Sequence, residues 1–357
     1  MSMDNPNHIT SSVSIVLCTY NGEKYLREQL DSLLAQTYPL HEIIIQDDHS
    51  TDGTMAILRE YADKYPIIKV FVHEARGTVN DNFFSAMQRA TGDFIAISDQ
   101  DDIWLPYKIV TLVNEIGDNL CCFHLTGQFT TNPDYRLKDT RIINVNLERM
   151  LFYGMVPGHT MLIRRQLLDI TLQYIPTDVL RRASSAFYYD SVLSIVAMVY
   201  GKIKYVPIAL DFHRVHAASC TSTNRRDLSQ RTIKNALLLI LRNLKPRRRH
   251  IIKPLIINRM LCEKALLDCI PDASPAYTRQ AYQVIAAYTK TASWRRPLSW
   301  IIGECQFICL LVQSRNALFY TKEKNQVVAT LRALTYPITM YDLREAEYQR
   351  IIKQKRP

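Results

Sequence analysis

The stretch VSIVLCTYNGEKYLREQLDSLLAQ, residues 13–36, decides the fold. Its first seven residues are mostly apolar and rich in β-branched side chains, which is typical of a buried strand. A polar turn follows, in which the side chain of Asn21 can cap a helix. Leucines then recur at helical spacing, at Leu26, Leu30, Leu33 and Leu34. The stretch therefore predicts a strand followed by an amphipathic helix.

The same alternation continues as far as residue 98. Further strands are expected at residues 42–47, 67–72 and 93–98, with helices through residues 55–62 and 82–90. Short apolar strands that alternate with amphipathic helices indicate an α/β fold, with a Rossmann-like, mostly parallel sheet covered on both faces. Right-handed crossovers would bring the carboxyl ends of the four strands to one edge, where ligands bind in such sheets.

Polar side chains follow all four predicted strands. They are Thr19, Tyr20 and Asn21 after the first strand, Asp47 and Asp48 after the second, Arg76 after the third, and Asp99, Asp101 and Asp102 after the fourth. An acidic turn on a solvated loop would not need this alignment along one edge. We therefore interpret the edge as a binding site.

The last of these groups places three carboxylates in four residues, within FIAISDQDDIWLPYK at residues 94–108. Neighbouring carboxylates repel one another, so the cluster would cost stability unless a cation lies there. Hard oxygen ligands suit Mg²⁺ or Mn²⁺, which keep open positions for substrate phosphates. The alternative interpretation is a solvated acidic turn that caps a helix.

The composition and the missing loop motifs limit the kinds of partner and binding site that this chain can have. The chain has 357 residues, 47% of them hydrophobic, and a net charge of +10, which favours anionic partners such as phosphates, nucleotides or an anionic membrane face. Eight cysteines without a CxxC pair indicate reduced thiols in a cytosolic protein. No GxxxxGK[ST] or GxGxxG loop follows the first strand, which argues against the usual kinase, ATPase and dinucleotide-binding sites.

Three segments in a fixed order carry a family resemblance: SIVLCTYNGEKYLREQLDSLLAQTY, IIIQDDHSTDGT and GDFIAISDQDDIW. They resemble the consecutive signatures of family 2 glycosyltransferases with the GT-A fold, closely over residues 13–108 and more loosely to about residue 219. Within that family, SDQDDIWLPYKI and PGHTMLIRR are most similar to bacterial rhamnosyltransferase-like members that build surface polysaccharides. The resemblance implies a metal-dependent inverting enzyme. It would move a sugar from a UDP or dTDP sugar, with dTDP-rhamnose among the candidates, to a saccharide hydroxyl.

The resemblance also implies a nucleotide-binding set. Its members are Thr19, Tyr20, Asn21, Asp47, Asp48, Arg76 and Asp99. Asp47 matches a carboxylate that accepts from the N3–H of a pyrimidine base, and Asp48 matches its neighbour on the ribose side. Arg76 occupies a position that often approaches the base or the ribose.

Asp99 and Asp101 match the DxD motif, which holds the metal and the sugar nucleotide, and the implied cofactor is Mg²⁺ or Mn²⁺. His216 lies in FHRVHAAS, matching a segment where an Arg and a His follow an edge strand and can meet the metal or the diphosphate. His213 and His216 are three apart, which also permits a metal pair, and we favour His216. For either histidine the alternative is a loop residue with backbone hydrogen bonds.

The catalytic base is expected in the second half of the catalytic domain. Asp190 in FYYDSV matches the family's acid at the start of a helix, although Tyr189 stands where Glu or His is usual. The alternative is a helix acid favoured by the dipole, and Asp178 is the second candidate. The implied acceptor or sugar pocket consists of Asp102, Gly158, His159 and Arg214.

Residues 1–224 are expected to form the catalytic domain, with a nucleotide-binding half at 13–108 and an acceptor half at 109–224. The pattern then changes to a basic helical region, residues 225–357. That region fits a helical cap with a solvated basic face or a peripheral contact with anionic lipid, and no nucleic-acid module is evident. The acceptor would then be a saccharide linked to a polyprenyl diphosphate.

The polar N-terminus carries no apolar signal region, and the longest apolar stretch, residues 300–312, is too short to span a bilayer. We therefore expect a cytoplasmic protein, either soluble or peripheral on the inner face of the cell membrane. Two rival functions stay open. One is a metal-dependent nucleotidyltransferase, which would need a Gly-rich loop after the first strand. The other is a nucleotide-sugar or glycan binding module without turnover, which would be expected to have lost the acidic cluster.

Overall fold

The chain divides into two compact units, which are described separately. The sheet unit comprises residues 1–138, 156–172 and 203–214, and the helical unit comprises residues 139–155, 173–202 and 215–357. The computed structural model describes residues 11–73, 77–129, 145–147, 150, 156–216, 241–243, 245–291, 297–313, 330 and 334. The boundary predicted near residue 224 lies outside the described residues.

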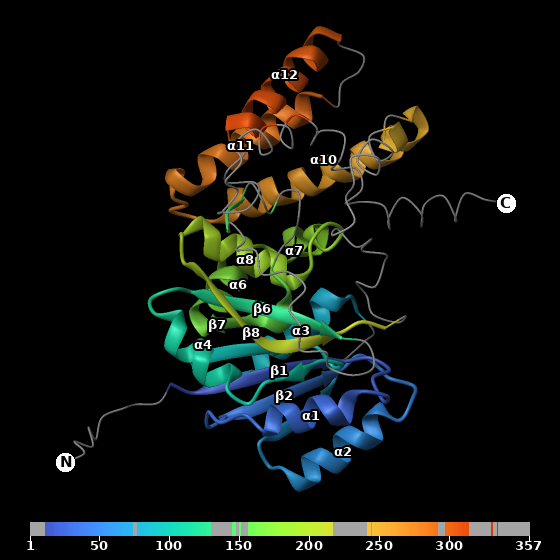
Figure 1. Ribbon diagram of the computed structural model, residues 1–357, viewed down its shortest axis with the longest axis vertical. Coiled ribbons are helices and arrows are strands. Elements are labelled where there is room, and N and C mark those ends of the chain that lie inside the picture. The colour runs from blue at the N-terminus through green and yellow to red at the C-terminus, as the bar shows by residue number, and fades with distance from the viewer. Residues whose placement is uncertain are drawn as a thin grey trace, which may run out of the picture. The chain divides into compact units, whose positions relative to one another are not determined.

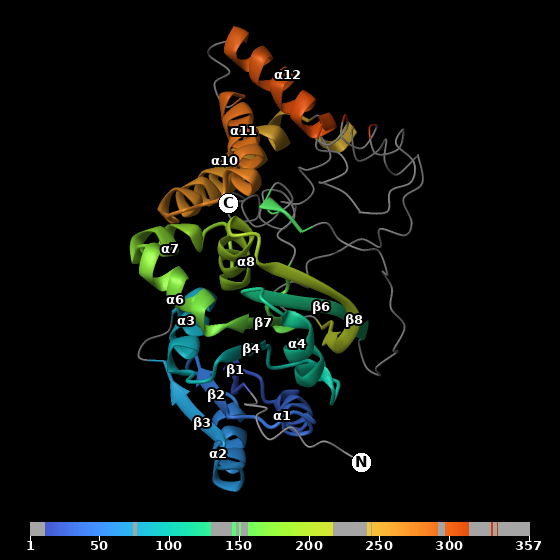
Figure 2. The ribbon, with the colours of Figure 1, turned by 90° about the vertical axis from the view of Figure 1, so that its left-hand side faces the viewer.

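Four parallel strands form the first half of the sheet. β1 (Val13–Thr19) lies between β2 (Glu42–Asp47) and β4 (Phe94–Ser98), and β3 (Ile68–Val72) borders β2. β1 and β2 are labelled in Figure 1, and all four are labelled in Figure 2. This arrangement confirms the four strands predicted from the sequence. Because the strands run in parallel, their carboxyl ends meet at one edge.

The sheet continues beyond β4 with strands of mixed direction. β7 (Met161–Arg164) pairs antiparallel with β4 and with β6 (Cys121–Phe129), and β8 (Ile203–Arg214) pairs parallel with β6. The two-residue strand β5 (Ile103–Trp104) runs antiparallel to β8. The full order is β3-β2-β1-β4-β7-β6-β8-β5. The α/β class with a mostly parallel sheet is therefore confirmed.

Helices cover both faces of the sheet (Figure 2). On one face, α1 (Leu26–Leu34), α2 (Thr54–Lys64) and α4 (Lys108–Ile116) contribute buried apolar side chains to a core that includes alternate residues of β1 and β2. On the other face, α3 (Val79–Arg89) contacts β1 and β2. The apolar periodicity of these helices explains why each presents one side to the sheet.

Asn21 does not cap α1, contrary to our expectation. The helix begins after Tyr25 without a side-chain cap, because a turn at residues 23–25 separates it from Asn21. Asn21 instead adopts a left-handed φ of 48°, and its Oδ1 accepts a hydrogen bond from the N–H of Thr51 at 2.8 Å. The residue therefore joins the loops that follow β1 and β2.

Glu42 is a buried acid at the start of β2, at the end of the strand away from the carboxyl edge. Its carboxylate accepts hydrogen bonds from Ser14 Oγ, from the backbone N–H and Oγ1 of Thr91, and from Lys69 Nζ, at 2.6 to 2.8 Å. Burial favours the neutral acid, but these donors outweigh it and lower the pKa of Glu42 to about 2.

Glu42→Gln is expected to destabilise the protein at neutral pH and to flatten its response to acid. The folded-state pKa lies below the unfolded value near 4.5, so the carboxylate stabilises the fold above about pH 4.5. That contribution, at most about 3 kcal/mol, is lost as the pH falls towards 2. Urea unfolding at pH 7, 4 and 3 measures the effect. Glu60→Gln is the matched control, because Glu60 pairs with Arg27 at the exposed surface. Equal acid sensitivity of wild type and Glu42→Gln would contradict the prediction.

The helical unit contains α7 (Thr177–Ala183), α8 (Tyr189–Val199), α10 (Pro246–Cys269), α11 (Pro275–Lys290) and α12 (Pro297–Gln313). Arg259 of α10 is buried, and its guanidinium donates to the carbonyls of Ala186 at 2.6 Å and Met150 at 2.8 Å. The helical C-terminal region predicted from the sequence is therefore present. Within the described ranges, no helix combines the length and the apolar character needed to cross a membrane.

Candidate functional site

The carboxyl ends of β1 and β2 meet at Thr19 and Asp47. The hydroxyl of Thr19 donates to Asp47 Oδ1 at 2.8 Å. Ser50 donates its hydroxyl to the same oxygen at 2.5 Å and its backbone N–H to Oδ2 at 2.7 Å. Asp47 is completely buried, so its carboxylate holds the loop after β2 in place. Its predicted contact with a nucleotide base stays a prediction.

Asp48 offers the more accessible carboxylate at this place. Its side chain is 14% exposed, and Oδ1 accepts from the backbone N–H of Gly77 at 3.2 Å, which places Gly77 at the same edge. Tyr20 is exposed at the edge. Arg76 lies outside the described residues. The predicted nucleotide-binding residues that are described therefore gather where β1, β2 and β4 end.

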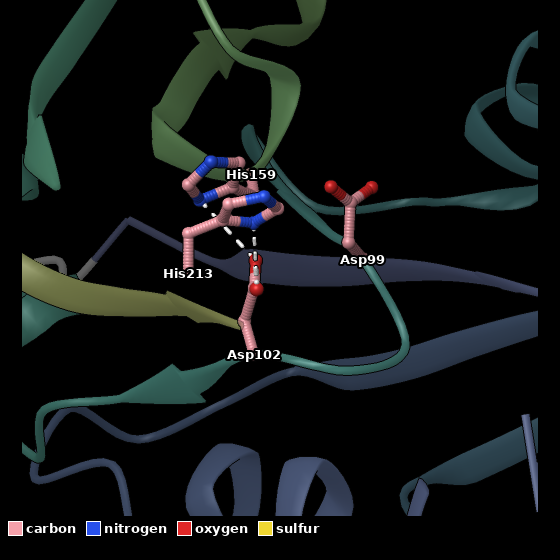
Figure 3. A group of neighbouring side chains, drawn as sticks. All are labelled: Asp99, Asp102, His159 and His213. Carbon is pink, nitrogen blue, oxygen red and sulfur yellow. Dashed lines mark hydrogen bonds and ion pairs between the residues drawn. The ribbon is translucent and has the colours of Figure 1, made fainter. Parts of the chain in front are cut away.

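Four side chains converge beyond the end of β4 (Figure 3). They are Asp99, Asp102, His159 and His213. One potential ligand atom from each residue lies within 4.8 Å of those of the others. Figure 3 shows the carboxylate of Asp102 pointing towards both imidazole rings, which are stacked with their centroids 5.1 Å apart. His213 Nδ1 lies 2.9 Å from Asp102 Oδ1, and His159 Nδ1 lies 3.4 Å from Asp102 Oδ2.

Three segments far apart in the sequence bring this group together. Asp99 follows β4, and His159 lies in a short 3₁₀ helix, η1 (Gly158–Thr160), that precedes β7. The antiparallel pairing of Ile103 with Phe212 places Asp102 beside His213. The backbone N–H of Arg214 also donates to Asp102 Oδ1 at 3.0 Å.

The donor set fits a divalent cation. Asp102 is fully buried, and within the described residues its Oδ2 makes no hydrogen bond and has His159 Nδ1, at 3.4 Å, as a positive neighbour. A buried carboxylate oxygen is costly without such a partner, and a divalent cation held between the four side chains would supply a second one. Burial, together with the neighbouring Asp102, raises the pKa of Asp99 to about 7. A positive ion at this place would favour the ionised form of both carboxylates. Two carboxylates and two imidazoles are ligands that Mn²⁺ accepts, whereas Mg²⁺ prefers oxygen alone.

The structure regroups the predicted site residues. Asp102 and His159, which were expected in the acceptor or sugar pocket, join Asp99 in the potential metal group. His213 joins them as well, whereas His216 was the expected histidine ligand. Asp101 and His216 are not members of that group. The spacing of Asp102 in DxDD is a signal that points to it, but the sequence holds no signal that pairs it with His159.

A network of buried charged side chains contacts His159, one member of the potential metal group. Lys108 is fully buried, and its Nζ donates to Asp211 Oδ2 at 2.8 Å and to the carbonyl of His159 at 2.6 Å. Asp211 Oδ2 also lies 2.9 Å from His159 Nδ1. Burial opposes the charged imidazole, but Asp211 and Asp102 outweigh it and raise the pKa of His159 to about 10. A cation bound by this imidazole would therefore have to displace its proton. Sequence reasoning missed both Lys108 and Asp211.

Arg214 and Gly158, two residues of the predicted pocket, are buried in the sheet unit. The guanidinium of Arg214 donates to the carbonyl of Asp101 at 2.9 Å and to Glu28 Oε2 at 2.7 Å, and it lies over the rings of Tyr25 and Phe129. Arg214 therefore ties the acidic turn to the N-terminal side of α1.

The two predicted catalytic acids belong to the helical unit. Asp190 lies in the first turn of α8, where its Oδ1 accepts from the backbone N–H of Ser191 at 2.5 Å. Asp178 lies in the first turn of α7, is mostly exposed, and pairs with Arg182 at 3.4 Å. His216 also belongs to this unit. Their predicted roles stay predictions.

Residues 14–171 match the family model described as "Glycosyl transferase family 2". Uncharacterized protein Rv1520 of Mycobacterium tuberculosis is 37% identical over 119 residues, which cover 31% of this chain and 34% of that protein. The putative teichuronic acid biosynthesis glycosyltransferase TuaG of Bacillus subtilis is 34% identical over 115 residues, covering 32% of this chain and 46% of TuaG. The chain thus matches between a third and a half of the length of these curated relatives.

Two solved structures share the fold over nearly the whole chain. One is S. aureus TarS 1-349 in complex with UDP-GlcNAc, with a TM-score of 0.51 and 18% identity, covering 95% of this chain and 92% of that one. The other is the mannosyltransferase PcManGT from Pyrobaculum calidifontis in complex with GDP-Man and Mn²⁺, also with a TM-score of 0.51 and 18% identity, covering 96% of this chain and 88% of that one. This likeness confirms the expected GT-A fold.

Proposed function

We propose that this protein, whose residues 14–171 match the model of glycosyl transferase family 2, transfers a sugar from a nucleoside-diphosphate sugar to a saccharide hydroxyl. The observation that carries the proposal is the convergence of Asp99, Asp102, His159 and His213 at the sheet edge where Thr19, Asp47 and Asp48 also lie. Two solved structures of the same fold hold nucleotide sugars, and one of them also holds Mn²⁺.

The described residues divide between the two ends of the donor. Tyr20 and Asp48 are accessible at the ends of β1 and β2 and would contact the base and ribose, while Asp47 holds the loop between them. Asp99, Asp102, His159 and His213 would hold Mg²⁺ or Mn²⁺, and the donor set favours Mn²⁺. A bound divalent cation would supply Lewis-acid stabilisation of the leaving diphosphate. The family resemblance implies a different set of metal ligands, namely Asp99, Asp101 and His216.

The proposed transfer inverts the anomeric carbon in a single in-line displacement. The attacking hydroxyl must lose its proton, so a carboxylate base is needed on the face of the sugar opposite the leaving group. Asp190 is the proposed base, because its carboxylate lies in the first turn of α8 and is only partly buried.

Asp190→Asn is expected to spare donor binding and to lower the transfer rate by about 10²-fold or more, because the amide cannot accept the hydroxyl proton. Release of the nucleoside diphosphate in the presence of saccharide acceptors measures the rate, and titration of the donor measures binding. Asp178→Asn is the matched variant. Near-normal transfer in Asp190→Asn combined with a loss in Asp178→Asn would move the base to Asp178.

The proposed donor carries a pyrimidine base, UDP or dTDP, and dTDP-rhamnose belongs on the test panel. The decisive experiment is calorimetric titration of the full chain with UDP, dTDP and GDP, each with and without Mn²⁺. Tight, Mn²⁺-dependent binding of one pyrimidine diphosphate supports the proposal. Binding without transfer of any sugar would favour a nucleotide-sugar binding module. Absence of binding by all three diphosphates would refute the proposal.

The proposed acceptor is a saccharide in bacterial surface-polysaccharide synthesis. TuaG, named for teichuronic acid biosynthesis, supports this setting, because it is 34% identical over the segment that it shares with this chain. An acceptor linked to a polyprenyl diphosphate would place the enzyme at the inner face of the cell membrane, as a peripheral protein.

The start of α10 is the proposed contact with anionic lipid. Lys245 and Arg247 are exposed there, and residues 245–262 contain no acidic side chain. Each basic residue near an anionic surface contributes about 1 kcal/mol to binding. The affinity for phosphatidylglycerol vesicles, measured by co-sedimentation, should therefore fall by about tenfold or more in the double variant Lys245→Gln/Arg247→Gln. Arg279→Gln/Lys290→Gln, which changes two exposed residues of α11, is the control. Equal binding of all three proteins would exclude this contact.

A further inference from the structure

Gln100 lies between two acids of the turn after β4, but its side chain reaches a different loop. Its Oε1 accepts from the backbone N–H of Tyr20 at 2.9 Å, and its Nε2 donates to the carbonyl of Tyr20 at 3.1 Å. The amide thus engages both polar groups of one residue's backbone. The β1–β4 ladder ends at Leu17 and Ser98, so this pair extends the contact between the two strands into the loops beyond them.

Gly22 makes room for this contact. A Cβ atom at Gly22 would lie 2.4 Å from Gln100 Oε1 and 2.8 Å from its Cδ. The side-chain amide therefore packs directly over the backbone of the loop after β1. A larger residue at position 22 would push the end of the half-buried Gln100 side chain away and break its hydrogen bonds to Tyr20.

The same loop is tied in turn to the loop after β2. The backbone N–H of Asn21 donates to Ser50 Oγ at 2.8 Å, and Ser50 donates to both carboxylate oxygens of Asp47. Gln100 is therefore linked by hydrogen bonds to Tyr20, Tyr20 by the backbone to Asn21, and Asn21 by hydrogen bonds through Ser50 to Asp47. Neutral groups make the link between the acidic turn and the loop after β1.

We propose that Gln100 is a positioning residue that couples cation binding at Asp99 to the order of the loop at residues 19–23. The proposal rests on the proposed function and deepens it, because that loop would line the nucleotide base. A cation that holds Asp99 restrains the adjacent Gln100 and, through it, Tyr20. Coupling between two binding sites is reciprocal, so base and cation strengthen each other's binding even without a phosphate between them.

The first experiment uses Mn²⁺ alone and no nucleotide. Hydrogen exchange of the peptide that contains residues 19–25 is measured by mass spectrometry in the full chain, with and without Mn²⁺. In wild type, Mn²⁺ is expected to slow this exchange by about fivefold or more. In Gln100→Met, which keeps the shape of the side chain but removes both hydrogen bonds, Mn²⁺ is expected to leave the exchange unchanged.

The second experiment uses uridine, which carries base and ribose but no phosphate to bridge to the cation. In wild type, Mn²⁺ is expected to raise the affinity for uridine by about fivefold or more, and uridine to raise the affinity for Mn²⁺ by the same factor. Nuclear magnetic resonance titration measures the first quantity and electron paramagnetic resonance of free Mn²⁺ the second. Gln100→Met should retain the Mn²⁺ affinity measured without uridine but lose the mutual enhancement.

Gly22→Ala is a second variant, because it displaces the Gln100 amide without changing Gln100, and it should reproduce the loss of coupling. Gln283→Ala, on the exposed side of α11, is the control and should behave as wild type. Unchanged exchange of residues 19–25 on adding Mn²⁺ to wild type, or a full Mn²⁺ effect in both loop variants, overturns the proposal. A wild type that binds no uridine counts against the proposed function instead, and the exchange experiment still decides the role of Gln100.

Discussion

Lys108→Met is expected to lower the free energy of unfolding by about 3 kcal/mol or more, because it removes the lysine cation that pairs with the buried carboxylate of Asp211 and leaves His159 as its positive partner. Both side chains of this ion pair are inaccessible to solvent, and among the residues that the structure describes Asp211 Oδ1 finds no hydrogen-bond partner. Burial disfavours the ionised form, yet Lys108 and His159 hold the pKa of Asp211 well below its usual value. Urea unfolding at pH 7 measures the loss.

A matched pair on the same sheet unit provides the control. Lys204 pairs with Glu115 at 2.9 Å, but both side chains are about 40% exposed, so Lys204→Met is expected to cost less than about 1 kcal/mol. Adding Asp211→Asn to Lys108→Met should recover part of the lost stability, because the amide carries no buried charge. Similar stability losses in Lys108→Met and Lys204→Met would show that the buried pair contributes no more than a surface one.

Asp99→Asn is expected to weaken Mn²⁺ binding by about 10²-fold, because it removes a ligand charge from the potential metal group while keeping the shape of the side chain. His213→Gln, which removes an imidazole ligand, should weaken it by about tenfold or more. Electron paramagnetic resonance of free Mn²⁺ measures both affinities without substrate. Asp118→Asn, an exposed acid after α4, is the control.

The same measurement of Mn²⁺ affinity distinguishes the ligand set that the structure brings together from the set that the family resemblance implies. Loss of Mn²⁺ affinity in His213→Gln with little change in Asp101→Asn supports the group that the structure brings together. The opposite result, a large loss in Asp101→Asn and none in His213→Gln, would return the site to the DxD pair with His216. Unchanged affinity in Asp99→Asn would contradict both sets.

Local patterns were sufficient for the nucleotide-binding half of the fold. Short continuous apolar runs indicate buried strands, and leucines at helical spacing indicate an amphipathic helix. Both patterns lie within a few neighbouring residues, so β1, α1, β2 and β4 could be predicted from the sequence. The parallel direction of the strands followed from the helices between them, and it placed Thr19, Asp47 and Asp99 at one edge.

The partners at that edge depended on tertiary structure. Asp102 meets His213 because β5 pairs with β8, and Gln100 meets Tyr20 because two loops close over the end of the β1–β4 ladder. Lys108 and Asp211 are 103 positions apart, and neither shows a local sign of burial as an ion pair. Sequence periodicity reports which face of an element is buried, whereas the register between distant segments decides which side chains meet. The sequence by itself therefore determined the sheet edge as the candidate site, and only the tertiary structure decided which acids, imidazoles and amide lie together there.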